Sequence, residues 1–144
     1  MRVDHAVEIS RSPGEVYGYL ADPGNLVDWQ EGLSEVRRNG KGPASVGDRW
    51  TEIRTAMGRR VEATVEVVEA EPARRFTVSS TAGPVRFRVE HALEPYGAGT
   101  RVSIVADGEQ RGVMRLAAPM VARQVREGFT ASFARLKALL EAEE

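Results

Sequence analysis

The chain has 144 residues, with 20 Lys and Arg against 21 Asp and Glu, and no cysteine. The net charge of −1 argues against a dedicated nucleic-acid binder, which carries a basic excess. The lack of cysteine excludes disulfide scaffolds, thiolate zinc sites and thiol catalysis. Apolar residues make up 42%, enough for a core, and no apolar run reaches the roughly 20 residues of a membrane span. The first ten residues carry charges and no apolar signal region, so a cytoplasmic protein is expected.

The amino-terminal part predicts one strand followed by two short helices. In residues 3–9 apolar and polar residues alternate, which is typical of a half-buried strand. Ser12 is a helix-capping residue, and Pro13 suits the first helical position. Asp22, which also precedes a proline, repeats this signal and predicts a second short helix over about 23–29.

From about residue 33 to residue 107 the pattern predicts strands joined by short turns. Glycine and proline interrupt the segment and predict turns. Examples are Met57-Gly58, which predicts a hairpin turn, and residues 95–99, which predict another turn. Because the connections are short, an antiparallel meander is expected. The expected strands are Leu33–Arg38, Asp48–Thr55, Arg60–Glu69, Arg75–Thr81, Val85–Leu93 and Arg101–Asp107.

The last part of the chain predicts one long helix, taken as Arg115–Glu141 and about 40 Å long at roughly 1.5 Å per residue. Its apolar residues are spaced by one, three and four, which places them on one broad face. Pro119 lies inside this pattern and should either kink the helix or mark its true start. The apolar residues are Val113, Leu116, Met120, Val121, Val125, Phe129, Phe133, Leu136 and Leu140.

This order of elements predicts a space inside the protein. A sheet with one apolar face must bury it, and the C-terminal helix is the only predicted element long enough to cover it. A strongly twisted sheet around one long helix leaves a concave space near the short helices. Concave, mostly apolar spaces are the usual small-molecule sites.

Several segments occur in the order typical of a known superfamily. They are Val7–Ile9 with Ser12, Pro13, Glu15 and Val16, Leu20–Pro23, Trp29, Val46–Asp48, Glu69–Pro72, Leu93–Pro95, Gly99–Val102 and Leu136-Lys137. Through them the sequence resembles the START-related superfamily, also called SRPBCC, and within it the polyketide cyclase/dehydrase-like branch. The resemblance covers nearly the whole chain.

The resemblance implies an α+β helix-grip fold. In this fold a strongly curved antiparallel sheet of about seven strands wraps around a long C-terminal helix, and two short helices follow the first strand. We therefore expect one START-like domain over residues 1–144. The superfamily includes lipid carriers, plant hormone-binding proteins, aromatase/cyclases and chaperone activators, so the fold alone does not select a function. A homodimer is compatible with the family.

The two histidines are expected to face the space between sheet and helix. His91 alternates in phase with Val89, so it should point inward as an acid or base, or as a polar group bonded to backbone or water. His5 shares the parity of its apolar neighbours. The superfamily's strand order places the two histidines two strands apart, roughly 10 Å. That distance is too long for one metal ion, so no metal and no cofactor are expected.

The sequence leaves open whether the two tryptophans and a charged pair contact a ligand in the cavity. Trp29 ends the second short helix, at the expected mouth of the cavity, where it either contacts a ligand or packs in the core. Trp50 and Ile53 cannot share a face, so the inward face of their strand is ambiguous. Glu52 and Arg54 share the parity of Trp50. They are therefore either a charged pair inside the cavity or part of a solvated surface.

The residues expected to contact a ligand combine the inward strand positions with two positions on the helix. Gln124, near the apolar face of the helix, could orient a ligand by hydrogen bonds. The full set is Trp29, Trp50, Val65, Phe76, Val78, Phe87, Val89, His91, Met120 and Gln124.

The leading hypothesis is a module that binds a hydrophobic small molecule, such as a lipid, an isoprenoid or a polyketide-like compound, between the sheet and the C-terminal helix. The alternative is a polyketide cyclase/dehydrase-type enzyme, in which cavity shape and one polar residue promote proton transfer, with His91 as the candidate catalytic residue. A protein-interaction domain similar to the chaperone-activator branch is the third hypothesis. The sequence leaves open which ligand is bound and whether the protein is an enzyme.

Overall fold

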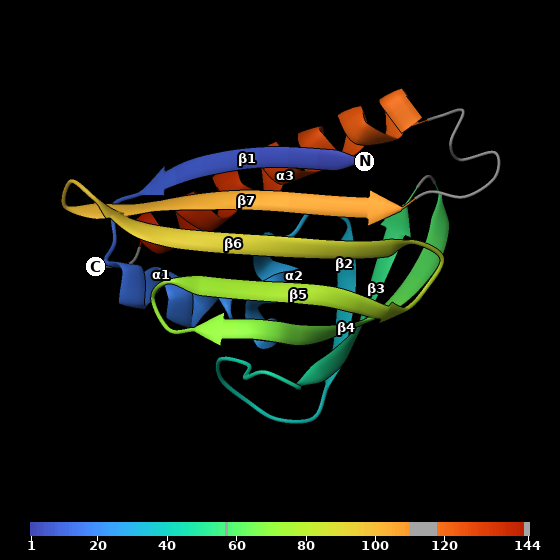
Figure 1. The fold of residues 1–144 in the computed structure, drawn as a ribbon, viewed down its shortest axis with the longest axis horizontal. Helices are drawn as coiled ribbons and strands as arrows, with labels where there is room; N and C mark the ends of the chain where they lie inside the picture. Colours follow the sequence, from blue (N-terminus) through green and yellow to red (C-terminus); the bar gives the residue numbers. More distant parts are fainter. Residues whose placement is uncertain (57, 110–117, 143–144) are drawn as a thin grey trace.

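The computed structural model describes residues 1–56, 58–109 and 118–142 (Figure 1). The elements in chain order are β1 (Arg2–Ile9), α1 (Pro13–Leu20), η1 (Pro23–Asn25), α2 (Leu26–Trp29), β2 (Leu33–Arg38), β3 (Arg49–Ala56), β4 (Arg59–Glu71), β5 (Arg75–Ala82), β6 (Arg86–Tyr96), β7 (Gly99–Glu109) and α3 (Ala118–Ala142).

The seven strands form one antiparallel sheet in the order β1-β7-β6-β5-β4-β3-β2. The first strand therefore lies beside the last strand. The sheet curves, and α1, α2 and α3 all lie on the same face of it, with α3 packed most closely on β1 (Figure 1). This arrangement confirms the predicted α+β helix-grip fold.

The short helices begin where the capping residues predict. The Oγ atom of Ser12 accepts a hydrogen bond from the backbone N–H of Glu15, at 3.3 Å, and Pro13 is the first residue of α1. The Oδ1 atom of Asp22 accepts from the N–H of Gly24, at 2.9 Å. The expected second helix is present over 23–29, but it is divided into the 3₁₀ turn η1 and the short helix α2.

The hairpin between β6 and β7 is tighter than expected. The sequence predicts a turn over 95–99, but β6 continues through Pro95 to Tyr96, which pairs with Gly99. Only Gly97 and Ala98 form the turn, and Gly97 has the positive φ of 58° that such a turn requires. Pairing with β7 thus extends β6 through Pro95, although a proline usually interrupts a strand. At the other end, β6 begins at Arg86, so the expected start at Val85 is wrong by one residue.

Pro119 is the second residue of α3 in the part of the chain that the structure describes. The residues expected to form an earlier start of the helix, which include Val113, Arg115 and Leu116, lie outside the described residues. Met57, expected in a hairpin turn, also lies outside them, and its neighbour Gly58 has a φ of 76°. In the described ranges, no helix has the apolar length that a membrane crossing requires.

The core lies between the inner face of the sheet and the helices. Residues that are directly opposite in an antiparallel register share a face. The inner face can therefore be followed from strand to strand, because Val102 lies opposite both Val7 and Leu93. The buried core cluster comprises Ile9, Val16, Tyr17, Leu20, Ala21, Leu26, Trp29, Leu33, Ala44, Trp50, Val65, Val67, Phe76, Val78, Leu93, Val102, Ile104, Phe133, Leu136 and Leu140.

Candidate functional site

Burial along the inner face changes from one end of the sheet to the other. On β6, His91 and Leu93 are buried, whereas Phe87 and Val89 are only half-buried although they point the same way. The same change occurs on β4 and α3. There the half-buried residues are Val61, Ala63, Val121, Val125 and Phe129, and the buried ones are Val65, Val67, Phe133, Leu136 and Leu140.

The half-buried residues of sheet and helix lie at the same end of the molecule. The C-terminal end of α3 is fixed at the opposite end, because the Nε atom of Arg11 donates to the carbonyl oxygen of Leu140 at 2.8 Å. The amino-terminal half of α3 therefore lies toward the end where β6 begins and β7 finishes (Figure 1). At this end, half-buried apolar side chains thus face the inside of the fold from both the sheet and α3, and we call this set of side chains the open-end groove. It consists of Val61, Ala63, Phe87, Val89, Val121, Val125 and Phe129.

The ends of β5, β6 and β7 surround a hollow of about 880 Å³ beside the open-end groove. Its lining includes the inward residues Ser80 and Phe87 together with the charged rim residues Arg86, Arg88 and Asp107. The N–H of Phe87 donates to the Oγ atom of Ser80 at 2.9 Å, which closes the two strands at this point. The groove thus ends in a solvent-accessible rim of mixed polarity.

His91 is a buried, neutral imidazole at the inner end of the groove. Its Nδ1 atom lies 2.9 Å from the carbonyl oxygen of Phe76 on the neighbouring strand. A carbonyl only accepts hydrogen bonds, so the proton is assigned to Nδ1. Burial lowers the pKa of His91 to about 4, and the hydrogen bond to Phe76 opposes this only partly. Among the hydrogen bonds of the described residues, none reaches the Nε2 atom, which is left as an acceptor.

The ring of Phe133 on α3 joins the two histidines and Trp29. His5 and His91 both lie opposite Ile104 in register, so they are two strands apart, as predicted. The ring centroid of Phe133 lies 5.8 Å from that of His5 and 6.0 Å from that of His91. Trp29 lies 5.1 Å away. Burial also lowers the pKa of His5. In the described ranges, no three or more His, Cys, Asp or Glu residues are grouped as metal ligands require.

The inward face of β3 carries Trp50, Glu52 and Arg54. Trp50 is buried and lies opposite Val65 of the core, so the structure selects the inward position for this set. The solvated-surface alternative is wrong. Ile53, on the opposite parity, is buried as well, but it lies outside the core cluster. Burial on both sides of one strand explains why the alternation of residues there was ambiguous.

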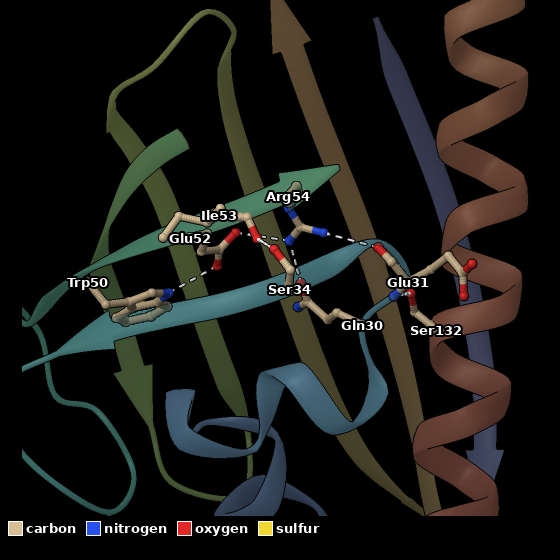
Figure 2. A network of polar contacts seen from close by, with 8 residues as sticks. All are labelled: Gln30, Glu31, Ser34, Trp50, Glu52, Ile53, Arg54 and Ser132. Atoms are coloured by element: carbon tan, nitrogen blue, oxygen red, sulfur yellow. Dashed lines mark hydrogen bonds and ion pairs between the residues drawn. The ribbon is translucent and has the colours of Figure 1, made fainter. Parts of the chain in front are cut away.

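A chain of polar contacts runs from β3 to α3 (Figure 2). The carboxylate of buried Glu52 accepts from Trp50 Nε1 at 3.0 Å and from Arg54 Nη2 at 2.9 Å. Arg54 also donates to the side-chain oxygen of Gln30 and, at 3.4 Å, to the carbonyl oxygen of Glu31. The backbone N–H of Glu31 donates to the hydroxyl of Ser132 at 2.8 Å. These contacts connect the segment after α2 to the long helix.

The expected ligand-binding residues occupy three different environments. Trp29, Trp50, Val65, Phe76 and Val78 are part of the core cluster. Phe87 and Val89 are half-buried in the open-end groove, with buried His91 behind them. Met120 is 62% exposed and Gln124 is also exposed, and neither belongs to the buried core cluster.

The indole Nε1 atom of Trp29 is buried and has no hydrogen-bond partner among the described residues. Trp50, by contrast, has Glu52 as its acceptor. A buried N–H without an acceptor costs free energy, and such groups are unusual in folded proteins. The indole of Trp29 is therefore an unused donor next to Phe133.

Four residues of the site were not singled out from the sequence. Phe133 was recognised only as one of several apolar helix residues, and nothing distinguished its central place. Gln30, Glu31 and Ser132 carry no motif at all. Their contacts join separate parts of the chain, 24 residues apart for Gln30 with Arg54 and 101 residues apart for Glu31 with Ser132, and local patterns carry no signal for such contacts.

Residues 1–141 match the model of the family described as polyketide cyclase/dehydrase and lipid transport. The chain belongs to this family. The family description names lipid transport and polyketide chemistry, both of which concern hydrophobic small molecules. No curated protein matches the chain in sequence.

Solved structures of similar fold come from several bacteria. TTHA0849 from Thermus thermophilus is 20% identical with a TM-score of 0.86, covering 99% of this chain and 98% of that one. A conserved protein from Geobacillus kaustophilus is 17% identical with a TM-score of 0.81, covering 99% and 96%. NE0264 from Nitrosomonas europaea is 19% identical with a TM-score of 0.78, covering 99% and 96%. At these identities the likeness is one of fold.

Proposed function

We propose that this protein binds a hydrophobic small molecule, such as a lipid, an isoprenoid or a polyketide-like compound, as one START-like domain over residues 1–144. The observation that carries the proposal is the open-end groove. Its apolar side chains face the inside of the fold and yet are only half covered. An apolar ligand that covers them gains roughly 25 cal/mol for each Å² removed from water. The family description supports the same ligand class.

The ligand lies, in this proposal, on Phe87 and Val89, with Val78 and His91 at its inner end and with Met120 and Gln124 on the helix side. The first two are half-buried and Met120 is exposed, so a ligand has apolar surface to cover on both sides. The other expected residues, Trp29, Trp50, Val65 and Phe76, form the packed wall behind the ligand.

The alternative is a cyclase/dehydrase-type reaction with His91 as the catalytic residue. Its specific support is the Nε2 atom, which is left as an acceptor while Nδ1 is held by Phe76. A pKa of about 4 makes this imidazole a weak base at neutral pH, because general bases work best when their pKa is near the working pH. The surroundings of His91 are mainly apolar, which favours binding over proton transfer.

The test is native mass spectrometry of the protein purified from its own host. We expect a bound hydrophobic compound that is lost from a Val89→Trp variant, in which the indole fills the groove. Val68→Trp is the matched control, because Val68 is exposed outside the core. Absence of any ligand, together with no thermal shift across a panel of lipids and aromatic compounds, would contradict the proposal. If a converted substrate is found, unchanged turnover by His91→Ala would exclude His91 as its catalytic residue.

A further inference from the structure

A guanidinium group borders the open-end groove on the inner face of the sheet. In the register of β3 and β4, Arg54 lies opposite Val61 and Glu52 lies opposite Ala63. Val61 and Ala63 are two of the half-buried residues of the groove. The charged pair therefore lies beside apolar surface that a ligand can cover, and it is the most polar feature of the inner face of β3.

Contacts on both sides hold Arg54 in place. Glu52, whose side chain is 6% exposed, binds one edge of the guanidinium, and Gln30 and the carbonyl of Glu31 bind it from the segment after α2. Glu31 is itself tied to Ser132 of α3 (Figure 2). A group that is already oriented loses little conformational entropy when it binds a ligand.

Arg54 still has donors to offer. A guanidinium carries five N–H bonds, one on Nε and two on each Nη atom. Gln30 and Glu52 engage Nη2, and Glu31 engages one N–H of Nη1. The N–H of Nε and the second N–H of Nη1 have no hydrogen-bond partner among the described residues. The side chain is 35% exposed, so part of the guanidinium group remains accessible to a further acceptor.

The charges around Arg54 already balance. The Glu52 carboxylate compensates the guanidinium at 2.9 Å, and Glu31 is paired with Arg135 at 3.5 Å. A ligand carboxylate would add a negative charge beside Glu52 with no cation left to pair with it, and an unpaired charge away from water is costly. A neutral carbonyl oxygen accepts the same hydrogen bonds without this cost.

We infer that Arg54 is the polar anchor of the groove and that it recognises a neutral carbonyl oxygen on an otherwise hydrophobic ligand. The ligand class is thus a hydrophobic ketone or similar carbonyl compound, not a plain hydrocarbon and not a fatty-acid anion. This inference rests on the proposed function, because the groove must hold the apolar body of the ligand.

The test compares three probes of nearly the same shape: 9-fluorenone, fluorene and fluorene-9-carboxylate. Their dissociation constants are measured by equilibrium dialysis with the full chain. We expect 9-fluorenone to bind about tenfold more tightly than either other probe, which corresponds to about 1.4 kcal/mol. We expect the double variant Glu52→Gln/Arg54→Met to bind fluorene as before and to lose this preference. The double change removes both charges, so no buried carboxylate is left unpaired.

The matched control is Arg60→Met/Glu62→Gln, which alters a pair of the same spacing on the outer face of β4, with Nη2 and Oε1 3.1 Å apart. It should keep the preference. If the first double variant does not fold, Arg54→Lys replaces it, since lysine keeps the charge beside Glu52 but lacks the planar fork of donors. It should also lose the preference.

Each outcome separates the inference from the proposed function. Equal binding of 9-fluorenone and fluorene by the unaltered protein overturns the role of Arg54 and leaves hydrophobic binding standing. A preference that persists in the Arg54 variants overturns it as well. Tightest binding of the carboxylate overturns the neutral ligand class. Binding of none of the three probes counts against the proposed function itself.

Discussion

The Nδ1 atom of His91 donates to the carbonyl oxygen of Phe76 across 2.9 Å, between two adjacent strands of the sheet. This bond satisfies the Nδ1 donor of the buried, neutral imidazole. Burial opposes the charged form, so the pKa of His91 falls from 6.5 to about 4. The residue that sequence reasoning singled out as an acid or base is thus held neutral at physiological pH.

The first prediction concerns pH. The unfolded chain binds a proton at His91 below about pH 6.5, whereas the folded chain does so only below about pH 4. Stability from this group is therefore fully present above pH 6.5 and is lost as the pH falls from 6.5 to 4, by at most about 3 kcal/mol. Urea unfolding at steps between pH 7.5 and 4 should show this decline.

The control for the pH prediction is His91→Gln, which does not titrate but keeps an N–H donor. Its free energy of unfolding should fall less over the same range. The lowered pKa of His5 acts in the same direction, so a His5→Gln variant is compared as well. Parallel curves for the unaltered protein and His91→Gln would contradict the assignment.

The second prediction concerns the buried charge pair. Arg54→Met leaves the Glu52 carboxylate buried without its cation and should lower the free energy of unfolding by about 2–3 kcal/mol, somewhat less than for a fully buried pair because Arg54 is partly exposed. Adding Glu52→Gln should recover at least half of this loss. A double-mutant cycle from denaturant unfolding measures the coupling. Additive losses would show that the two side chains do not interact.

The third prediction concerns Phe133, whose ring contacts His5, Trp29, His91 and Phe129. Phe133→Ala should lower the free energy of unfolding by about 3–5 kcal/mol, since it removes a buried ring and leaves a cavity.

Leu139→Ala is the control for Phe133, because Leu139 lies on the same helix and is 36% exposed. We expect this substitution to change the free energy of unfolding by less than about 1 kcal/mol. Equal losses in the two variants would mean that Phe133 does not occupy the centre of the packed cluster. Denaturant unfolding of both variants decides between these outcomes.

The fourth prediction uses two glycines with opposite expectations. A Cβ atom at Gly99 would lie 2.3 Å from the backbone oxygen of Ile9, so Gly99→Ala must push two strands apart and should cost several kcal/mol, on the order of 2–4. A Cβ at Gly18, inside α1, meets no atom within 4 Å. Gly18→Ala should therefore stabilise the protein by about 0.5–1 kcal/mol. Thermal unfolding of both variants would show shifts of opposite sign.

Local patterns predicted the elements well where one face of a strand or helix is apolar and the other polar. The alternation around His91 correctly placed that side chain inward, and the capping pattern at Ser12 located α1. Prediction was less accurate at the ends of elements. Pairing with β7 extends β6 through Pro95, and this pairing is not visible in the sequence of β6 alone.

On β3 the sequence was ambiguous for a physical reason. Trp50 and Ile53 are both buried although they lie on opposite faces, because the curved sheet has Trp50 against the core while Ile53 is also covered on the other side. Periodicity identifies the inward face only when the outer face is solvated. Whether Arg54 lies inside the fold was therefore open until the register with β4 was known.

The sequence by itself determined the order of the elements and the apolar faces of those strands whose other face is solvated, because neighbouring residues encode both. It also determined the balance of charge. Only the tertiary structure decided that His5, Trp29 and His91 meet at Phe133, and that Arg54 is bound by Gln30 and Glu31. Such contacts join residues far apart in the chain, and they depend on how strongly the sheet curves around α3. That curvature results from packing of the whole domain, which no local pattern records.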